Sequence, residues 1–282
     1  MQFDITLSKS LSTSKVDLLY TPMKLQNKRA LVTGAASGIG KAIAIAFARE
    51  GADVAVLDIN ETKAAEVVAQ ITSLGRKSKF IPCDVGSSPA VAAAFQEVER
   101  DFGGVDILVN NTGIIRFSQI VDMPEEDWDI IIRTNLKSVF LCSQQAARQM
   151  IRQRSGGRII SISSIHAVLS EPNCGHYTAA KGGIESFSRT LATELAPHKI
   201  TVNFIRPGAT YTELTTPMYT DAVKRSLFER VPLKEIAEAE WIASGAVFLA
   251  SDDARYMTGQ SLTIDGGYVM DGSLPSAEYC KE

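Results

Sequence analysis

Two side chains four residues apart, Tyr177 and Lys181, form the pair in this sequence best suited to acid–base chemistry. Residues four apart on a helix lie on the same face, one turn apart. A lysine ammonium beside a tyrosine hydroxyl favours the phenolate and lowers a pKa that is normally about 10. We therefore expect Tyr177 to exchange a proton near neutral pH. Ser164 lies just after the preceding apolar run and could hydrogen-bond the same substrate oxygen. The Tyr-x-x-x-Lys spacing taken alone also occurs by chance on solvated helices.

A glycine-rich turn follows the first apolar run, Arg29–Val32, and precedes a segment with helical periodicity. Glycines there allow a tight turn, a close approach of the backbone to a pyrophosphate, and packing of the helix on the strand. The helix N-terminus offers its free N–H groups to the phosphates. The spacing is Gly-x-x-x-Gly-x-Gly rather than the Gly-x-Gly-x-x-Gly fingerprint. The dinucleotide contacts expected from this turn are Gly34, Ser37, Gly38, Ile39 and Gly40.

Asp58 ends the second apolar run, 18 residues after Gly40. A carboxylate in this position can accept hydrogen bonds from both hydroxyls of an adenosine ribose, and it repels a 2′-phosphate. The turn at Ser37 carries no basic residue to neutralise such a phosphate. The alternative is that Asp58 only caps the next helix. With the glycines beside it, Asp58 predicts NAD in preference to NADP.

Polar residues follow the next two apolar runs. Asp84 and Val85 come after the third run, where a side chain could meet the adenine edge, and Asn110–Gly113 follows the fourth. A doubly wound sheet reverses its strand order there, and ligands bind in that crevice. The asparagines could alternatively be turn formers only. Asn135 lies in the middle of a helical segment, where asparagine is unfavourable, and it predicts a local break with a polar role.

Short apolar runs alternate with helix-patterned segments along the chain, which predicts a single α/β domain with a doubly wound, Rossmann-type parallel sheet covered by helices on both faces. The predicted domain spans residues 23–272. Residues 1–22 are expected to be a flexible extension and residues 273–282 a tail. The expected strands are 29–32, 54–58, 80–83, 107–110, 158–162, 201–205 and 261–264, and the expected helices are 38–50, 62–74, 89–102, 124–152 with a break, 177–196 and 238–250.

Composition narrows the class of protein. The net charge of −3 gives no basic surface for nucleic acid, and no apolar run reaches the roughly 18 residues that a membrane helix needs. The first residues lack the apolar core of a secretory signal. The four cysteines are widely spaced, which favours reduced thiols in the cytoplasm, and no cluster of histidines or carboxylates indicates a metal site.

Taken together, these motifs resemble the short-chain dehydrogenase/reductase family over residues 23–272. The motifs that carry the resemblance are Thr33–Gly40, Asp84-Val85, Asn110–Gly113, Asn135, Ser164, Tyr177-x-x-x-Lys181 and Asn203–Thr212. The resemblance implies that Tyr177 is the acid/base and that Ser164, rather than Ser163, orients the substrate oxygen. It also implies that Lys181 binds the nicotinamide ribose and that Asn135 holds a relay water. Further cofactor contacts implied in this way are Asp84, Val85, Asn111, Thr112, Gly113, Tyr177, Pro207, Gly208, Thr210 and Thr212.

Two positions depart from the family pattern. Thr112 replaces the usual alanine and places a hydroxyl near the cofactor, and Thr210 replaces the usual Ile or Val. Neither removes a catalytic group. The segment 212–231 resembles the lid that covers the substrate in this family.

The substrate is the least determined feature of the sequence. The segments around Ser164 and Tyr177 resemble the glucose and rhamnose dehydrogenase branch, so we expect a sugar or polyol substrate. Contacts to sugar hydroxyls could come from His166, Asn173 and His176, with Glu171 nearby, or these side chains could only pack. The alternatives are a reductase of 3-oxoacyl thioesters on an acyl carrier protein, a secondary-alcohol dehydrogenase, and an NAD-binding sensor without turnover.

The segment 177–196 carries an apolar stripe at Ala180, Ile184, Phe187, Leu191 and Leu195. In the family this helix packs against a second subunit, which implies a homotetramer.

Overall fold

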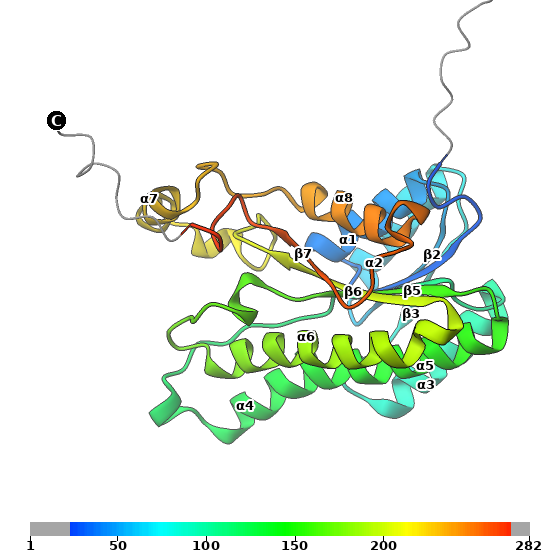
Figure 1. Ribbon diagram of the computed structural model, residues 1–282, viewed down its shortest axis with the longest axis horizontal. Coiled ribbons are helices and arrows are strands. Elements are labelled where there is room, and N and C mark those ends of the chain that lie inside the picture. Colours follow the sequence, from blue (N-terminus) through cyan, green and yellow to red (C-terminus); the bar gives the residue numbers. More distant parts are fainter. Residues whose placement is uncertain (1–22, 272–282) are drawn as a thin grey trace, which may run out of the picture.

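A computed structural model of the protein describes residues 23–271. The predicted extension 1–22 and tail 273–282 lie outside the described residues. The remaining chain folds around one seven-stranded sheet sandwiched between two layers of helices (Figure 1).

All seven strands of the sheet are parallel, in the order β3-β2-β1-β4-β5-β6-β7. Residues of the central strands alternate between the two faces: in β1, Val32 belongs to the apolar core on one side and Leu31 to the core on the other. Burial on both faces explains the uninterrupted apolar runs in the sequence. The strands are β1 (Arg29–Thr33), β2 (Asp53–Asp58), β3 (Ser78–Pro82), β4 (Ile107–Asn110), β5 (Gly157–Ile162), β6 (Ile200–Pro207) and β7 (Ser261–Ile264).

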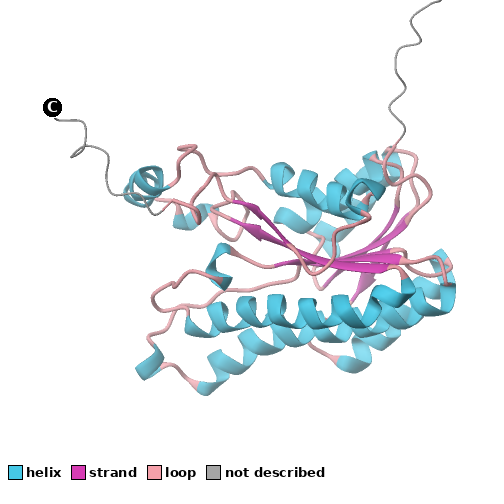
Figure 2. Ribbon diagram, in the orientation of Figure 1, coloured by secondary structure: helices cyan, strands magenta, loops and turns pink. Residues whose placement is uncertain are grey.

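Helices cover both faces of this sheet, as Figure 2 shows. One layer consists of α1 (Gly38–Arg49), α2 (Glu61–Ser73) and α8 (Ala239–Ala250), which share a core with the sheet. The opposite core is built with α3 (Ser88–Phe102), α5 (Ser138–Gln153) and α6 (Gly175–Leu195), beside which α4 (Glu125–Ile131) lies. The predicted doubly wound α/β fold is therefore confirmed.

The predicted break at Asn135 is a short π-helical segment, Ile132–Lys137, between α4 and α5. It lets the buried Asn135 side chain leave the helical register and bind the backbone of Ile114, through Oδ1 (2.9 Å from the Ile114 nitrogen) and Nδ2 (2.9 Å from its oxygen). The sequence did not predict α7 (Asp221–Arg230), which has no fully buried residue and so no apolar stripe to detect.

The order of strands places β1 between β2 and β4, so the crossovers leave β1 in opposite directions along the sheet. Beyond the carboxyl ends of these strands the loops diverge and leave a crevice. The motifs Thr33–Gly40, Asp84-Val85, Asn110–Gly113 and Ser164 lie at this edge, and Tyr177 and Lys181 lie on α6, which begins there.

Candidate active site

A cavity of about 610 Å³ opens across the carboxyl ends of the strands. Its walls come from the segments that follow β1 to β6, which brings together residues far apart in the sequence. The predicted site residues that line it are Gly34, Ser37, Gly38, Ile39, Asp58, Asp84, Val85, Asn111, Thr112, Gly113, Ser164, Tyr177, Lys181, Pro207, Gly208, Thr210 and Thr212.

The glycine turn after β1 forms one end of the cavity. Gly34 and Gly38 have φ angles of 62° and 53°, a conformation that glycine adopts without strain. Gly40 does not line the cavity. A Cβ atom on Gly40 would lie 2.2 Å from the carbonyl oxygen of Gly34, so this glycine allows α1 to pack directly against the turn. The turn thus presents bare backbone and a helix N-terminus to the cavity, as a pyrophosphate requires.

Asp58 lies at the end of β2 and already accepts three backbone hydrogen bonds. Its Oδ2 accepts from the nitrogen of Ala36 in the glycine turn (3.0 Å), and its Oδ1 accepts from the nitrogens of Ile59 (2.8 Å) and Asn60 (2.9 Å). The helix α2 is capped by Asn60 instead, whose side chain accepts from Lys63. Asp58 therefore fixes the shape of the turn and still presents a carboxylate to the cavity.

Asn111 ties the segment after β4 to the glycine turn, because its Nδ2 donates to the carbonyl oxygens of Thr33 and Gly34, both at 3.0 Å. The neighbouring Thr112 lines the cavity, and its hydroxyl is buried without a hydrogen-bond partner. The extra hydroxyl expected from the sequence is therefore present at the cavity wall and not engaged by the protein.

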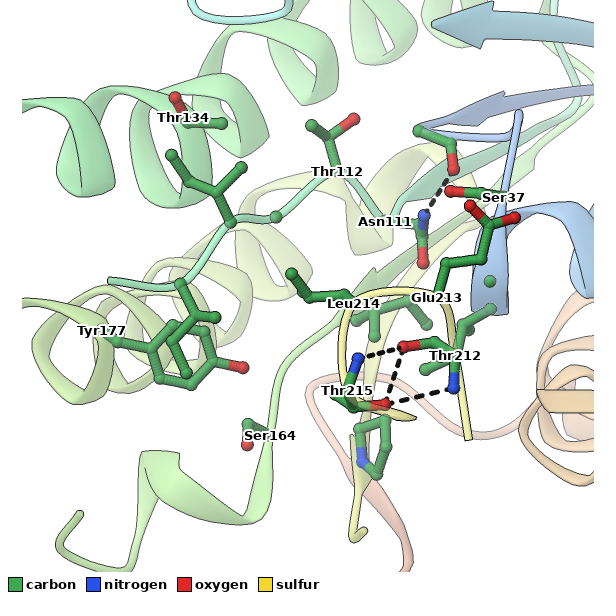
Figure 3. Close-up of a pocket in the computed structure, with 18 of the residues that line it drawn as sticks. Ser37, Asn111, Thr112, Thr134, Ser164, Tyr177, Thr212, Glu213, Leu214 and Thr215 are labelled. Atoms are coloured by element: carbon green, nitrogen blue, oxygen red, sulfur yellow. Dashed lines mark hydrogen bonds between the residues drawn. The ribbon is translucent and has the colours of Figure 1, made fainter. Parts of the chain in front are cut away.

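Ser164 and Tyr177 lie at the opposite end of the cavity from Ser37 and Asn111 (Figure 3). Ser164 follows β5, and its hydroxyl accepts a hydrogen bond from the nitrogen of His166 (3.1 Å) while remaining able to donate. The adjacent Ser163 hydroxyl instead donates to the Glu185 carboxylate (3.0 Å). This difference supports the choice of Ser164 over Ser163.

The electrostatics of Tyr177 and Lys181 differ from the expectation. Burial of the hydroxyl raises the pKa of Tyr177 to about 12, and an interaction with Ser164 offsets only part of this rise. Burial likewise lowers the pKa of Lys181 to about 8. The Lys181 ammonium lies 5.5 Å from the centre of the Tyr177 ring and donates to the carbonyl oxygen of Ile162 (2.8 Å). The predicted lowering of the tyrosine pKa is therefore wrong for this structure, because desolvation outweighs the distant ammonium.

Asn135 does not line the cavity but lies just behind it. A Cβ atom on Gly113 would be 3.6 Å from Lys181 Nζ and 3.7 Å from Asn135 Oδ1, so the two side chains approach each other across this glycine. The relay water predicted for Asn135 stays a prediction.

The three candidate sugar contacts do not line the cavity. His176 is fully buried in the first turn of α6, with its Nε2 lacking a partner, and Asn173 is exposed with a φ of 64°. His166 Nδ1 faces the carboxylate of Glu171 at 3.4 Å, and burial lowers the pKa of this histidine. The helix α6 begins at Gly175, earlier than predicted, which turns His176 toward the core.

Sequence reasoning missed a group of apolar residues that line the cavity. Ile114, Ile115, Ile130 and Leu214 line the cavity together with Tyr219. The paired isoleucines after the Asn-Asn-Thr-Gly motif were the available signal. Other unpredicted lining residues are Ile59, Cys83, Arg133, Thr134, Ile162, Ser163, Glu213 and Thr215.

The segment after β6 curls over the cavity. Thr212 and Thr215 bind each other through their hydroxyls (2.8 Å), and the Thr215 hydroxyl also donates to the carbonyl oxygen of Thr210 (2.5 Å). The next side chain, Glu213, forms an ion pair with Lys63 on α2. Both partners are substantially exposed, so this pair bridges the rim of the cavity in contact with solvent.

Three cysteines of the described chain are unpaired and buried. Cys83 lies on the cavity wall, and burial raises its pKa to about 11. Burial also raises the pKa of Cys174 to about 11 and that of Cys142 still further. No group of three or more metal-ligating side chains occurs within residues 23–271. Over the same residues, no helix is both long and apolar enough to cross a membrane.

Comparison with known proteins identifies this arrangement. The family model described as enoyl-(acyl carrier protein) reductase matches residues 34–269. The 3-oxoacyl-[acyl-carrier-protein] reductase of Staphylococcus epidermidis is 42% identical over 245 residues, which cover 86% of this chain and 100% of that protein. The chain belongs to the short-chain dehydrogenase/reductase family. It is therefore an oxidoreductase that acts on CH–OH or carbonyl groups and uses a nicotinamide cofactor.

Solved structures of this short-chain dehydrogenase/reductase family agree with the fold. A 7α-hydroxysteroid dehydrogenase complexed with NADH and 7-oxo glycochenodeoxycholic acid has a TM-score of 0.85 and 35% identity, covering 89% of this chain and 98% of its own. A protein assigned as a 2-deoxy-D-gluconate 3-dehydrogenase from Agrobacterium tumefaciens, with bound NADP, has a TM-score of 0.83 and 34% identity, covering 89% of this chain and 100% of its own. Relatives thus bind either nicotinamide dinucleotide.

The residues that line the cavity of this short-chain dehydrogenase/reductase also fit a nicotinamide dinucleotide, independently of the comparisons. The glycine turn leaves a cradle that Cβ atoms would fill, since an added Cβ at Gly34 would meet Thr112 at 3.0 Å. Asp58 lies beside the glycine turn, where it accepts from the nitrogen of Ala36, and Ser164 and Tyr177 lie at the end of the cavity opposite Ser37. The phosphates, the adenosine and the reacting ring therefore each have a matching part of the cavity wall.

Proposed function

We propose that this protein is an NADH-dependent reductase of ketones that carry an apolar chain, with 3-oxoacyl thioesters as the foremost substrate class. The observation that carries the proposal is that Ile114, Ile115, Ile130 and Leu214 line the same cavity as the catalytic hydroxyls. Moving an acyl chain from water onto apolar side chains makes binding more favourable by about 25 cal/mol per Å² of apolar surface buried. The relation to a 3-oxoacyl reductase points in the same direction.

In the proposed reaction Tyr177 donates the proton. With a pKa raised to about 12, the tyrosine hydroxyl holds its proton at neutral pH, and an alkoxide is basic enough to take it. Ser164, whose hydroxyl can still donate, orients the substrate carbonyl oxygen toward the tyrosine. A bound nicotinamide supplies the hydride.

Lys181 and Asn135 act behind the tyrosine in this proposal. Lys181 binds the nicotinamide ribose, and with a pKa lowered to about 8 it can return a proton to Tyr177 at neutral pH. Asn135 holds the water that connects Lys181 with solvent, from its position across Gly113. Neither role requires either side chain to touch the substrate.

The proposed preference for NAD(H) rests on Asp58. Its carboxylate stands at the cavity wall, where it accepts ribose hydroxyls and repels a 2′-phosphate. The basic residues on the wall are committed elsewhere: Arg133 binds Asp84 at 3.0 Å, and Lys181 lies at the catalytic end. The comparisons include relatives with each cofactor, so the charge of Asp58 is the supporting observation.

A sugar or polyol substrate is the second candidate. The segments that resemble sugar dehydrogenases favour it, as does the 2-deoxy-D-gluconate 3-dehydrogenase assignment of one similar structure. Against it, His166, Asn173 and His176 do not line the cavity.

The decisive experiment follows absorbance at 340 nm with acetoacetyl thioester and NADH, beside a panel of aldoses, polyols and simple secondary alcohols with NAD⁺. We expect thioester reduction to dominate and Tyr177→Phe to abolish it while NADH binding, followed by fluorescence, persists. Turnover confined to aldoses would replace the substrate proposal and leave the mechanism standing. Turnover by Tyr177→Phe at the wild-type rate would overturn the mechanism itself.

We further propose that the protein works as a cytoplasmic homotetramer. The free cysteines fit a reducing compartment. On the outer side of α5 and α6, Phe140 is 43% exposed and meets Phe187 edge to face, an apolar surface that a second subunit could cover. Light scattering coupled to gel filtration distinguishes a tetramer from a dimer or a monomer.

A further inference from the structure

The proposed mechanism leaves one buried charge on the catalytic helix unexplained. Glu185 is 3% exposed and lies on α6, four residues after Lys181 and eight after Tyr177. Residues at this spacing form a single stripe along a helix. The catalytic face of α6 therefore continues into a carboxylate that does not line the cavity.

The Glu185 carboxylate joins three elements of the fold. Arg206 at the end of β6 binds it through two hydrogen bonds, Nε to Oε1 at 2.6 Å and Nη2 to Oε2 at 2.5 Å. Such paired contacts fix the orientation of both groups as well as their distance. From the end of β5, the Ser163 hydroxyl lies 3.0 Å from Oε1 and also 3.3 Å from the carbonyl oxygen of Lys181.

The partners of Glu185 immediately precede the parts of the site that must be aligned. Ser163 precedes Ser164, which orients the substrate oxygen in the proposed mechanism. Arg206 precedes Pro207 and Gly208, which line the cavity. The carboxylate thus binds one residue at the end of β5 and one at the end of β6, and each of these residues directly precedes a residue that lines the cavity.

Stability alone does not account for this pair. Burying two charges carries a desolvation cost that can exceed their attraction, and apolar replacements of buried ion pairs are often neutral or stabilising. What such a pair does provide is a fixed geometry. Catalytic rates depend steeply on geometry, since a misplacement of about 1 Å can cost 100-fold.

We propose that Glu185 is a positioning residue: its carboxylate locks α6 to the ends of β5 and β6 and thereby holds the Tyr177 hydroxyl in register with Ser164 and with the Pro207–Gly208 segment. This inference rests on the proposed roles of Tyr177 and Ser164. It assigns no contact with substrate or cofactor to Glu185.

The test compares Glu185→Gln with Arg189→Gln as a matched control. Arg189 is exposed and lies 3.8 Å from Glu185 Oε2, so its loss leaves the contacts with Arg206 and Ser163 in place. We expect Glu185→Gln to lower kcat by about 10- to 100-fold with less than a threefold change in KM and in the NADH dissociation constant, because the remainder of the cavity wall is intact. Arg189→Gln should keep kcat within about twofold.

A double variant, Glu185→Leu with Arg206→Met, separates positioning from stability. It removes both charges together, so we expect a melting temperature close to that of the wild type while kcat stays as low as in Glu185→Gln. Recovery of kcat together with the melting temperature would reduce the pair to a structural role and overturn the inference. A folded Glu185→Gln with wild-type kcat would do the same.

Two further variants keep the test decisive. If Glu185→Gln does not fold, Ser163→Ala removes only the hydroxyl link, and we expect it to lower kcat about three- to tenfold without lowering the melting temperature; an unchanged kcat overturns the inference. Tyr177→Phe, measured in parallel, reports on the proposed function. Persistent turnover in that variant would mean the mechanism fails, whereas its loss combined with a normal Glu185→Gln would mean only the positioning role fails.

Discussion

The packing of α1 against the glycine turn gives a prediction whose sign is set by geometry. In a helix, replacing glycine by alanine normally stabilises by about 0.5–1 kcal/mol because alanine loses less backbone entropy. At Gly40 the added Cβ would lie 2.2 Å from the Gly34 oxygen and 2.4 Å from Asn111 Nδ2, against the 3.0 Å below which real Cβ contacts essentially do not occur.

One of these atoms belongs to the backbone and cannot rotate away, so α1 or the turn itself must move. Overpacking of this kind costs about 1–3 kcal/mol, which exceeds the gain in propensity. We therefore expect Gly40→Ala to lower the free energy of unfolding by about 1–2 kcal/mol. Because the displaced atoms form the phosphate cradle, the NADH dissociation constant should rise about tenfold or more, as 1.4 kcal/mol corresponds to a factor of 10.

Gly182→Ala is the matched control, since Gly182 is also helical and its added Cβ would meet only the Ala167 oxygen, at an ordinary 3.6 Å. This variant should keep or raise the free energy of unfolding. Urea unfolding followed by circular dichroism and NADH fluorescence titration measure the two quantities. If Gly40→Ala unfolds and binds NADH like the wild type, or if both variants shift alike, the close-packing argument for the turn is refuted.

The remaining predictions concern charge. Asp58→Ser combined with Ile59→Arg should move the ratio of kcat/KM for NADPH and NADH by about 100-fold toward NADPH, because a repelling carboxylate becomes an attracting guanidinium; an unchanged ratio rejects the role given to Asp58. Lys181 has a pKa lowered from 10.5 to about 8, so above pH 8 the unfolded chain binds more protons than the folded one and this group adds stability as pH rises. The unfolding free energy of the wild type minus that of Lys181→Met should therefore rise from pH 8 to pH 10. A difference that does not change with pH contradicts the shift. Glu213→Gln removes the exposed pair with Lys63 and should speed NADH release by less than about fivefold, an effect that stopped-flow fluorescence should find absent in 1 M salt.

Most of the fold could be predicted from the sequence because the sheet is buried on both faces. Strands such as β1 and β4 then read as continuous apolar runs, and the polar residues that follow them gather at one edge of the sheet. The π-helical break was signalled by Asn135, since asparagine is unfavourable inside a helix unless its side chain has a partner. In contrast, α7 contacts the remainder of the molecule with no fully buried side chain and left no pattern to detect.

Features that depend on three-dimensional burial were not predicted. The pKa of Tyr177 was expected to fall because Lys181 is four residues away, yet the depth of the hydroxyl decides the direction of the shift. His176 was a candidate sugar contact because its segment resembles the sugar dehydrogenases, but it is fully buried and successive helical residues point in different directions. The Glu185–Arg206 pair was overlooked although the spacing from Tyr177 and Lys181 and the arginine before Pro207 were both visible.

The buried thiols make the folded protein a reporter of its own opening. A thiol whose pKa is raised by burial reacts with dyes only when the surrounding structure opens, so the labelling rate measures an opening equilibrium. With Cys174 and Cys280 replaced by serine, Cys142 on α5 should report the opening of the core between α5 and the sheet, and Cys83 should report the cavity wall. Cofactor binding should then slow the labelling of Cys83 far more than that of Cys142. The two labelling rates would separate stabilisation of the cavity wall from stabilisation of the whole fold.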